Sequence, residues 1–240
     1  MATALTARVI TKDDIGPDVV QVDFEMVDPP EIRYEAGQYI ILHTAEQNGK
    51  VVKRSYSIAS PPNSRGFSLC VKVVGVASQF VSDLKSGDQV KFSGPWGMGK
   101  FTFPEKTESE IVLVATGTGF SPINSILHSK LAAHPETKFL FLWGLKREQD
   151  IYLQNVLDEA AKKHPHFSYR IILSDASPSW PGKRGMLSKV FSDEIGAVDG
   201  KEYFLAGNGA MIVRVEGYLK GHGVPVEKIH KEIFFLPAEV

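Results

Sequence analysis

A change of hydrophobic pattern near residues 101–108 is the feature that most constrains the fold of this chain. Before it, between Ala7 and Gly94, short segments alternate apolar and polar residues and are separated by Asp, Pro, Gly and Asn, which is typical of antiparallel β structure. After it, Glu110 leads into an apolar run that ends at Ala115, as expected of a strand buried on both faces. The sequence therefore predicts two domains, residues 1–104 and residues 105–240.

The first predicted domain contains six candidate strands and one short helix. Six antiparallel strands in an open sheet would expose two edges, so a closed six-stranded barrel is expected. The helix is predicted over residues 78–84, with Ser78 as its N-cap. The candidate strands are residues 6–11, 19–26, 38–44, 51–59, 67–74 and 89–93.

The second predicted domain alternates strands and helices, which is typical of an α/β fold with a doubly wound, mainly parallel sheet. Its first helix is expected to have Ser121 as N-cap and Pro122 as the first helical residue. Further helices are predicted over residues 152–162, 186–191 and 211–220. The strands are predicted over residues 110–115, 139–143, 169–173, 203–206 and 229–234.

Composition excludes several classes of function. The formal net charge is −1 and the sequence pI is about 6.7, so no broad basic field for nucleic acid or a membrane surface is expected. Cys70 is the only cysteine, which excludes disulfides within the chain and a cysteine-ligated iron–sulfur cluster. His164 and His166 lack further ligands at useful spacing, so no metal site is expected. Because no signal segment or membrane-spanning run is present, a soluble cytoplasmic protein is expected.

A short stretch in the first domain is the leading candidate for ligand binding. If it forms a strand, alternation places Arg54 and Tyr56 on one face and Ser55 and Ser57 on the other. A guanidinium for phosphate, a phenol ring for stacking and a hydroxyl for ring heteroatoms suit a flat, phosphorylated, heteroaromatic ligand. Flavin nucleotide is the predicted ligand, and an ordinary exposed strand is the alternative.

The first of two glycine turns is a candidate phosphate site in the same domain. It consists of Gly75, Val76, Ala77 and Ser78, where a strand is expected to pass into a helix. Glycine lets the backbone approach a ligand, and amides at a helix start, helped by the Ser78 hydroxyl, would bind a pyrophosphate. A plain turn with an N-cap is the alternative.

The second glycine turn follows the first buried strand of the α/β domain, where such folds bind dinucleotides. Pro122 stands where the usual dinucleotide fingerprint has its third glycine, and no acidic residue ends the next strand. Ser174 and Asp175, after the following strand, are therefore predicted to contact a ribose. The turn itself is Thr116-Gly117-Thr118-Gly119.

Together these stretches resemble the ferredoxin–NADP reductase-type flavoproteins, which combine a flavin-binding barrel with a pyridine-nucleotide domain. The resemblance covers nearly the whole chain and rests on the order and spacing of its motifs. They are Arg54-Ser55-Tyr56-Ser57, Leu69-Cys70-Val71-Lys72, Gly75-Val76-Ala77-Ser78, Leu84-Lys85-Ser86-Gly87-Asp88 through Gly94-Pro95-Trp96-Gly97, Gly117-Thr118-Gly119-Phe120-Ser121-Pro122, Ala206-Gly207-Asn208-Gly209-Ala210-Met211 and Glu232-Ile233-Phe234.

The resemblance implies roles for the residues of the flavin side. Arg54 would hold the flavin phosphate, Tyr56 would stack on the isoalloxazine, and Ser57 would bond near the reactive N5. The backbone of Val71 and Lys72 would bond the pyrimidine edge. Ser55 in the same strand, and the turn from Gly75 through Val76 and Ala77 to Ser78, complete the predicted FAD site.

The resemblance also implies a site for NADH or NADPH. Glu232 and Phe234 would lie by the flavin ring, with Phe235 as an alternative cover, and Ser57 and Glu232 are the candidates for a catalytic role. The pyrophosphate would lie on the second glycine turn. The predicted nucleotide-binding residues are Thr116, Gly117, Thr118, Gly119, Pro122, Ser174, Asp175, Ala206, Gly207, Asn208 and Met211.

Two departures from the family pattern bear on activity. Ala206 replaces the cysteine that many relatives have, so slower turnover is expected, since hydride transfer depends mainly on positioning. Asp175 stands where NADP-specific relatives commonly have arginine, and a carboxylate repels a 2′-phosphate, which favours NADH. Lys183 and Arg184 could instead supply cations for that phosphate.

The sequence and this resemblance thus predict an FAD enzyme, FAD being favoured over FMN because the family usually carries it and both phosphate contacts are present. It would take a hydride from NADH or NADPH and pass single electrons to a separate acceptor such as a ferredoxin, a flavodoxin or an oxygenase component. The alternatives are a flavin reductase that releases reduced flavin and a non-catalytic electron-transfer or nucleotide-sensing subunit. The oligomeric state is not predicted.

Overall fold

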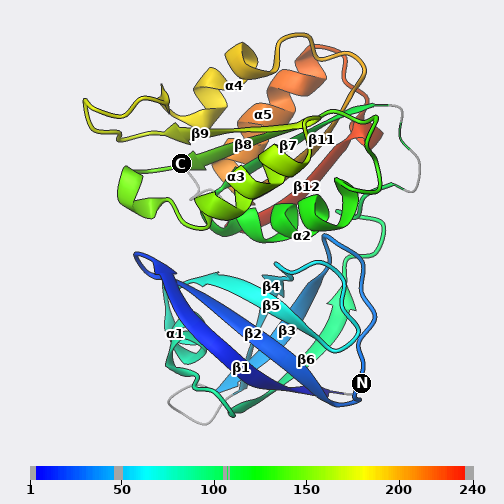
Figure 1. Ribbon diagram of the computed structural model, residues 1–240, viewed down its shortest axis with the longest axis vertical. Helices are drawn as coiled ribbons and strands as arrows, with labels where there is room; N and C mark the ends of the chain where they lie inside the picture. Colours follow the sequence, from blue (N-terminus) through cyan, green and yellow to red (C-terminus); the bar gives the residue numbers. More distant parts are fainter. Residues whose placement is uncertain (1–3, 46–50, 105–106, 108, 236–240) are drawn as a thin grey trace. The chain divides into compact units, whose positions relative to one another are not determined.

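The computed structural model describes residues 4–45, 51–104, 107 and 109–235 of the chain. These residues form two compact units (Figure 1). The first contains the described residues up to Phe103 together with Asn124–Ser129, and the second begins at Pro104 and contains the rest. The functional boundary predicted between residues 104 and 105 stays a prediction.

The first unit is built on an antiparallel six-stranded sheet in the order β4-β3-β6-β1-β2-β5. An isolated antiparallel bridge between Ile58 and Leu69 joins the β4 end of this order to the β5 end. The predicted six-stranded barrel is therefore confirmed. The strands are β1 Leu5–Gly16, β2 Val19–Asp28, β3 Tyr39–Ala45, β4 Val51–Ser57, β5 Gly66–Lys72 and β6 Gln89–Trp96.

Strand β2 shows why the alternating pattern produces a barrel wall. Val20, Val22, Phe24 and Met26 are buried, and the residues between them are partly exposed. This period of two matches the pleat of a strand that has one face on the core. Each large apolar side chain that is fully buried in this way contributes about 1.5–3 kcal/mol. The barrel core is thus the sum of inward-facing residues from every strand.

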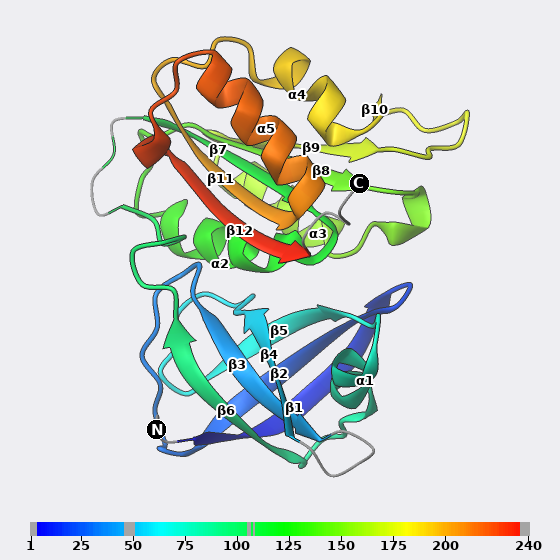
Figure 2. The same ribbon diagram turned by 180° about the vertical axis from the view of Figure 1, so that it is seen from behind.

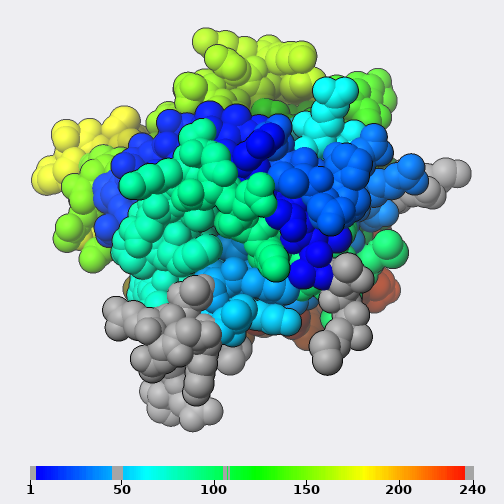
Figure 3. Space-filling model, turned by 90° about the horizontal axis from the view of Figure 1, so that it is seen from below, coloured from blue at the N-terminus to red at the C-terminus, as the bar shows by residue number. Residues whose placement is uncertain are grey.

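The helix of the first unit, α1 (Val76–Asp83), corrects one prediction. Its N-cap is Gly75, whose backbone is extended, and Ser78 lies inside the first turn. The prediction of Ser78 as N-cap is wrong because the helix begins directly after the glycine. The Lys12 ammonium of β1 donates to the Ser82 carbonyl at 2.8 Å near the end of α1, and Figure 3 shows this teal segment beside dark blue β1.

The second unit is built on a parallel six-stranded sheet in the order β10-β9-β8-β7-β11-β12. Figures 1 and 2 show α4 and α5 on one face and α2 and α3 on the other, which confirms the doubly wound α/β fold. The elements are β7 Glu110–Thr116, η1 Gly117–Gly119, α2 Phe120–Lys130, β8 Phe139–Leu145, η2 Glu148–Asp150, α3 Gln154–Lys163, β9 Phe167–Leu173, β10 Lys183–Arg184, α4 Leu187–Ile195, β11 Lys201–Asn208, α5 Gly209–Gly221, η3 Val226–Lys228 and β12 Ile229–Phe235.

The start of α2 differs from the prediction. Helical backbone already begins at Gly117, in the short 3₁₀ turn η1, and passes into α2 at Phe120. The prediction of Ser121 as N-cap is therefore wrong, because the glycine turn itself is helical. The Phe120 ring packs against Trp143 of β8 with ring centroids 4.7 Å apart, which holds this first turn on the sheet.

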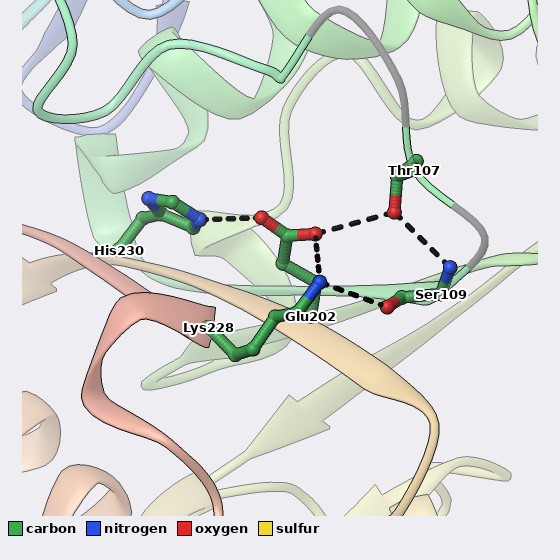
Figure 4. A network of polar contacts seen from close by, with 5 residues as sticks. All are labelled: Thr107, Ser109, Glu202, Lys228 and His230. Carbon is green, nitrogen blue, oxygen red and sulfur yellow. Dashed lines mark hydrogen bonds and ion pairs between the residues drawn. The ribbon is translucent and has the colours of Figure 1, made fainter.

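The amino-terminal end of β11 carries a buried charged network (Figure 4). The Glu202 carboxylate is 4% exposed and accepts from His230 Nε2 at 2.7 Å, Lys228 Nζ at 3.3 Å and Thr107 Oγ1 at 3.2 Å. Lys228 Nζ also donates to Ser109 Oγ at 3.3 Å. This network ties the segment before β7 to the start of β12.

None of the helices of the described residues is both long and apolar enough to cross a membrane. Within the same ranges, no cluster of three or more His, Cys, Asp or Glu side chains could hold a metal ion.

Candidate functional site

Strand β4 carries the predicted flavin residues with the expected alternation. Arg54 and Tyr56 lie opposite Leu42 and Ile40 of β3, whose side chains are buried in the barrel. Ser55 and Ser57 lie opposite Ile41 and Tyr39, on the other face of the strand. The guanidinium and the phenol ring are therefore on one face and the two hydroxyls on the other.

Electrostatics differ between the members of this strand. The Arg54 side chain is exposed and donates to the Lys53 carbonyl at 2.9 Å. Burial raises the pKa of the Tyr56 phenol, and the nearby Arg54 charge opposes that rise. Tyr56 thus stays a neutral ring, partly buried against the core, while the Arg54 cation stays at the surface. Ser57 is buried.

Strand β5 lies at the opposite end of the sheet order, so β4 and β5 each have one strand neighbour in that order. Val71 is 2% exposed and pairs with Val20, while Lys72 is exposed and pairs with Val19. The Val73 amide donates to the Asp18 carbonyl at 2.7 Å, which holds the chain on β2 just before the glycine turn. On its other side β5 is joined to the chain after β4 at Ser68 and Leu69, and its last residues, Val71 and Lys72, lie beyond that bridge.

The turn after β5 uses Ser78 differently from the prediction. Ser78 Oγ accepts from the amides of Val74 at 2.8 Å and Gly75 at 3.0 Å, and its hydroxyl donates to the Gly75 carbonyl at 2.8 Å. The hydroxyl therefore holds the turn together. The amides at the first turn of α1, those of Val76 and Ala77, are the groups that helix geometry leaves without an intrahelical acceptor.

The same turn passes a test of fit for the FAD that the predicted site requires. A Cβ built on Gly75 meets nothing within 4 Å, and the flanking side chains of Val74 and Val76 are 63% and 59% exposed. Open space, free-pointing helix amides and exposed apolar side chains suit a ligand that covers the turn with a phosphate. The exposed Arg54 cation in the same unit suits a second phosphate contact.

The second glycine turn, at the end of β7, has a fixed shape. Gly117 has φ of +53°, in the left-handed region that favours glycine, and a Cβ there meets nothing within 4 Å. Its carbonyl accepts from Trp143 Nε1 at 3.0 Å and from Tyr152 Oη at 3.1 Å. Because the carbonyl is held inside, the open side of the turn is available to a phosphate group.

Close packing of the backbone at this turn explains why two other positions, 119 and 207, are occupied by glycine. A Cβ on Gly119 would collide with the Ala206 carbonyl of β11, and a Cβ on Gly207 would lie 2.6 Å from the Thr116 carbonyl oxygen. Gly207 has φ of +117°. The backbones of this turn and of the end of β11 are therefore packed so closely that only glycine fits at positions 119 and 207. Thr118 and Pro122 are buried under the turn.

The end of β11 brings the other predicted nucleotide residues together. The Asn208 amide donates to Thr116 Oγ1 at 2.9 Å, and Asn208 Oδ1 caps α5 by accepting from the amides of Ala210 at 2.9 Å and Met211 at 3.3 Å. Ala206 is fully buried and lies opposite Glu232 of β12. In the same strand, Phe234 is half-buried, and Phe235 is exposed and lies opposite Asn208.

The predicted ribose residues reveal a partner that the sequence reasoning missed. Asp175 Oδ2 accepts from Arg147 Nε at 2.7 Å, and both side chains are about half exposed, at 55% and 51%. The pKa of Arg147 is raised, first by its hydrogen bond to Asp175. Ser174 and Asp175 donate their amides to the carbonyls of Leu145 and Lys146. Arg147 lies two residues after the end of β8, and the parallel pairing of β8 with β9 brings it close to Asp175; this pairing was the available signal.

The cations named as the alternative ribose-phosphate contacts have other partners. Lys183 Nζ lies 3.2 Å from Glu194 and 3.6 Å from Asp193, and the pKa of Lys183 is raised chiefly by its hydrogen bond to Glu194. Arg184 donates to the carbonyls of Pro178 at 2.7 Å and Trp180 at 3.0 Å. Lys183 therefore pairs with α4, and Arg184 holds the loop between β9 and β10.

Comparison with known proteins agrees with this geometry. Residues 6–102 match the oxidoreductase FAD-binding domain model and residues 113–216 match the oxidoreductase NAD-binding domain model. The chain is 32% identical over 241 residues to "Ferredoxin--NADP reductase B" of Sorangium cellulosum (strain So ce56), covering 96% of this chain and 98% of that protein.

Two further relatives are named as reductases. "Terephthalate 1,2-dioxygenase, reductase component 1" of Comamonas sp is 27% identical over 233 residues, covering 95% of this chain and 68% of that protein. The crystal structure of Amycolatopsis cytochrome P450 reductase GcoB superposes with a TM-score of 0.87 at 30% identity, covering 99% of this chain and 71% of that chain. The predicted resemblance is confirmed: this chain belongs to the ferredoxin–NADP reductase-type family and is an FAD- and NAD(P)-binding oxidoreductase.

Proposed function

We propose that the protein takes a hydride from NADH or NADPH, with NADH preferred, and passes single electrons to a separate acceptor protein. The observation that carries this proposal is the presence of two open glycine turns, at Gly75 and Gly117, each at the end of a strand and the start of a helix. Bound FAD would supply the chemistry that joins two-electron and one-electron steps. Ferredoxin, flavodoxin and an oxygenase component are the candidate acceptors.

The printed names of the relatives support an acceptor of this kind. One is a ferredoxin–NADP reductase and another is the reductase component of a dioxygenase. Cys70 is the only cysteine of the 240 residues, so a cysteine-ligated cluster is absent from this chain. We therefore propose that the acceptor of single electrons is a separate protein or subunit.

We assign residues 1–104 to FAD and residues 105–240 to NADH or NADPH. In the first range, Arg54 and the amides of Val76 and Ala77 hold phosphates, Tyr56 covers the flavin ring and Ser57 contacts its reactive edge. The backbone of Val71 and Lys72 binds the pyrimidine edge. These roles are supported by the alternation of β4, the place of Val71 and Lys72 at the end of β5 beyond the Ile58–Leu69 bridge, and the space over Gly75.

In the second range, the turn from Thr116 to Gly119 holds the pyrophosphate, supported by the inward carbonyl and open outer side of Gly117. Asn208 fixes the start of α5 beside it. Glu232 and Phe234 of β12 are proposed to contact the reacting rings, and Glu232 is paired with Ala206 of β11. Glu232 and Ser57 are the two residues to which we give a catalytic role.

The preference for NADH is proposed from Asp175, whose carboxylate would accept from a ribose hydroxyl and repel a 2′-phosphate. The ion pair with Arg147 weakens that repulsion, since a guanidinium attracts the same phosphate. We therefore expect a modest preference for NADH rather than strict exclusion of NADPH.

Anaerobic stopped-flow mixing of the yellow holoprotein with NADH and with NADPH tests the proposal. We expect the flavin absorbance to bleach with both, faster with NADH, and the colour to survive extensive dialysis. A protein that loses its colour on dialysis would be a flavin reductase that releases its product. A yellow protein that neither nucleotide bleaches would be a non-catalytic subunit, and the proposal would be lost.

A further inference from the structure

The four residues that follow β4, Ile58 to Pro61, form a turn that several segments of the first unit hold. We call residues 58–61 the post-strand turn. The Ile58 amide donates to the Gln38 carbonyl at 3.0 Å. The Ala59 amide donates to the Ser68 carbonyl at 2.8 Å, and the Ser68 amide returns a bond to Ser60 Oγ at 2.9 Å. Two neighbouring strands thus fix the start of the turn.

Tyr34 fixes the middle of the turn. Its hydroxyl donates to the Pro61 carbonyl at 2.6 Å and lies 3.0 Å from Ser60 Oγ. Because the phenol has a single proton, the Ser60 hydroxyl is the donor between the two. Tyr34 is 7% exposed, and burial raises its pKa although the Ser60 bond opposes that rise. The Tyr34 phenol therefore stays protonated near neutral pH, so its bond to the Pro61 carbonyl is not lost by titration.

Helix α2 contributes the remaining bonds, through residues that belong to the first unit. Asn124 Nδ2 donates to the Ala59 carbonyl at 2.9 Å, and Ser125 Oγ donates to the Ser60 carbonyl at 2.6 Å. Ser125 is fully buried. The Ser60 carbonyl would lose this donor if the hydroxyl were removed and would need a new partner, so removal of the hydroxyl favours a shift of the turn.

The place of the turn gives these bonds a functional meaning. Tyr56 and Ser57 immediately precede the post-strand turn and end β4, whose ladder is formed with β3. The barrel closes onto β5 only beyond them, through the bridge between Ile58 and Leu69, so the position of these last residues of β4 depends on what anchors the chain that follows. The turn is anchored on its amides, carbonyls and side chain at once, which is more than a surface loop requires.

We infer that Ser125 and Asn124 are positioning residues that fix Tyr56 and Ser57 through the post-strand turn. This inference rests on the proposed function, because it assigns the two residues to the placement of the proposed flavin contacts. Loss of the Ser125 hydroxyl lets the Ser60 carbonyl move toward a new donor, and Ser57, three residues away, moves with it. A reaction between two aligned rings is sensitive to shifts of a few tenths of an ångström.

The full-length protein carrying Ser125→Ala tests the inference against a matched control, Ser129→Ala. The Ser129 hydroxyl lies on the same helix and donates over the same 2.6 Å, but to the Ser125 carbonyl inside the helix. Two measurements are made on each variant. The first is amide hydrogen exchange over residues 54–61 in the protein stripped of flavin, and the second is the rate of flavin reduction at saturating NADH per bound flavin.

We expect Ser125→Ala to speed exchange over residues 54–61 about threefold or more and to slow reduction per flavin about threefold to tenfold. Ser129→Ala should match the unchanged protein in both. Asn124→Ala, which removes the donor to the Ala59 carbonyl and suits a helix, should show the same pattern more weakly and serves if Ser125→Ala does not fold.

The outcomes separate the inference from the proposed function. If Ser125→Ala lowers only the melting temperature, and neither exchange nor the rate per flavin differs from Ser129→Ala, the hydroxyl is merely structural and the inference fails. If the unchanged protein is not reduced by NADH or NADPH, the proposed function fails. In that case equal exchange in the two serine variants overturns the inference as well, while faster exchange in Ser125→Ala still supports the anchoring of the strand.

Discussion

The two ends of the parallel sheet in the second unit are built on opposite principles. At the amino-terminal end, a buried carboxylate, Glu202, is bonded by His230, Lys228 and Thr107 (Figure 4). At the carboxyl-terminal end, the turn at Gly117 is open to space on its outer side. The first end satisfies its polar groups within the chain, and the second presents polar groups outward.

This difference teaches where the sheet can bind a ligand. Parallel strands direct their carboxyl ends, with the helix starts that follow them, toward the same edge, where dinucleotides bind in open α/β sheets. Charges at that edge, such as Arg147 and Asp175, remain about half exposed. Glu202, 4% exposed, is positioned for stability instead. The comparison predicts that substitutions at the carboxyl-terminal end change the binding of the nucleotide, whereas those at the amino-terminal end change stability alone.

The largest expected effect concerns the packing under the carboxyl-terminal turn. In Gly119→Ala the new Cβ would collide with the Ala206 backbone, which cannot give way as a flexible side chain would. We expect a loss of about 3 kcal/mol in the free energy of unfolding, measured by urea denaturation followed by circular dichroism, together with loss of NADH binding.

Gly217→Ala is the control for this substitution, since Gly217 lies in the interior of α5 and a Cβ there meets nothing within 4 Å. The free energy of unfolding of the Gly217→Ala protein should rise by about 0.5–1 kcal/mol, because alanine has a higher helix propensity than glycine. A Gly119→Ala protein as stable as the unchanged one would show that the turn and β11 can separate at no cost. The close-packed description of this end would then be wrong.

The amino-terminal end should give the next largest effect, on stability alone. Glu202→Gln keeps the size of the side chain but removes the charge that pairs with Lys228 and His230. We expect a loss of about 2 kcal/mol, because breaking a buried pair leaves its partners uncompensated. Urea denaturation measures the loss, and the affinity for NADH, measured by titration, should not change.

Glu110→Gln offers a matched control at the same end, because its carboxylate is 42% exposed and pairs with Lys138 at 3.0 Å. An exposed pair of this kind contributes less than about 1 kcal/mol. If Glu202→Gln bound NADH more weakly under conditions where all of the protein is folded, the amino-terminal end would affect binding and the proposed division of roles between the two ends would be wrong.

The fold could be predicted from the sequence because its signals are local. Alternation in segments such as Val20 to Met26 records a strand with one buried face, and the run after Glu110 records a strand with two. Helix starts were less certain. Ser78 and Ser121 have side chains that suit an N-cap. However, Gly75 is the N-cap of α1, and the 3₁₀ turn η1 before α2 already begins at Gly117.

The candidate site could be predicted in part. The motifs at Arg54 and Gly117 lie within single stretches, so spacing along the chain reveals them. The pair Arg147–Asp175 joins residues 28 positions apart, and the bonds of Asn124 and Ser125 to the post-strand turn span 65 positions. Such contacts depend on which strands and helices become neighbours in the fold, and the order of residues in a single sequence does not reveal this.

The coenzyme preference tests the carboxyl-terminal end with a smaller effect. In Asp175→Asn the repulsion of a 2′-phosphate is removed and Arg147 is released from its ion pair. We expect the ratio of kcat/KM for NADPH to that for NADH to rise about tenfold, the effect of one favourable charged contact. Steady-state kinetics with a one-electron acceptor dye measures this ratio.

The stability of Asp175→Asn should stay within about 0.5 kcal/mol of the unchanged protein, because the pair is half exposed. Arg147→Ala should lower the same ratio, which tests whether the guanidinium contacts the phosphate. An unchanged ratio in both variants would place the ribose away from Asp175 and would remove the basis for the NADH preference.

The smallest effect is the pH dependence of the amino-terminal network. Burial raises the pKa of Glu202, but the His230 hydrogen bond and the Lys228 charge outweigh it, and the pKa lies below its ordinary value of 4.5. A carboxyl group with a lowered folded pKa adds stability above its unfolded pKa and loses it as the pH falls through the folded value. The difference in unfolding free energy between the unchanged protein and Glu202→Gln should therefore be constant above about pH 5.5 and shrink as the pH falls below 4.5. Urea denaturation of both proteins across that range measures it. A difference that grew as the pH fell would mean that the Glu202 carboxyl group is protonated within the network, and the amino-terminal end would then be held by neutral hydrogen bonds.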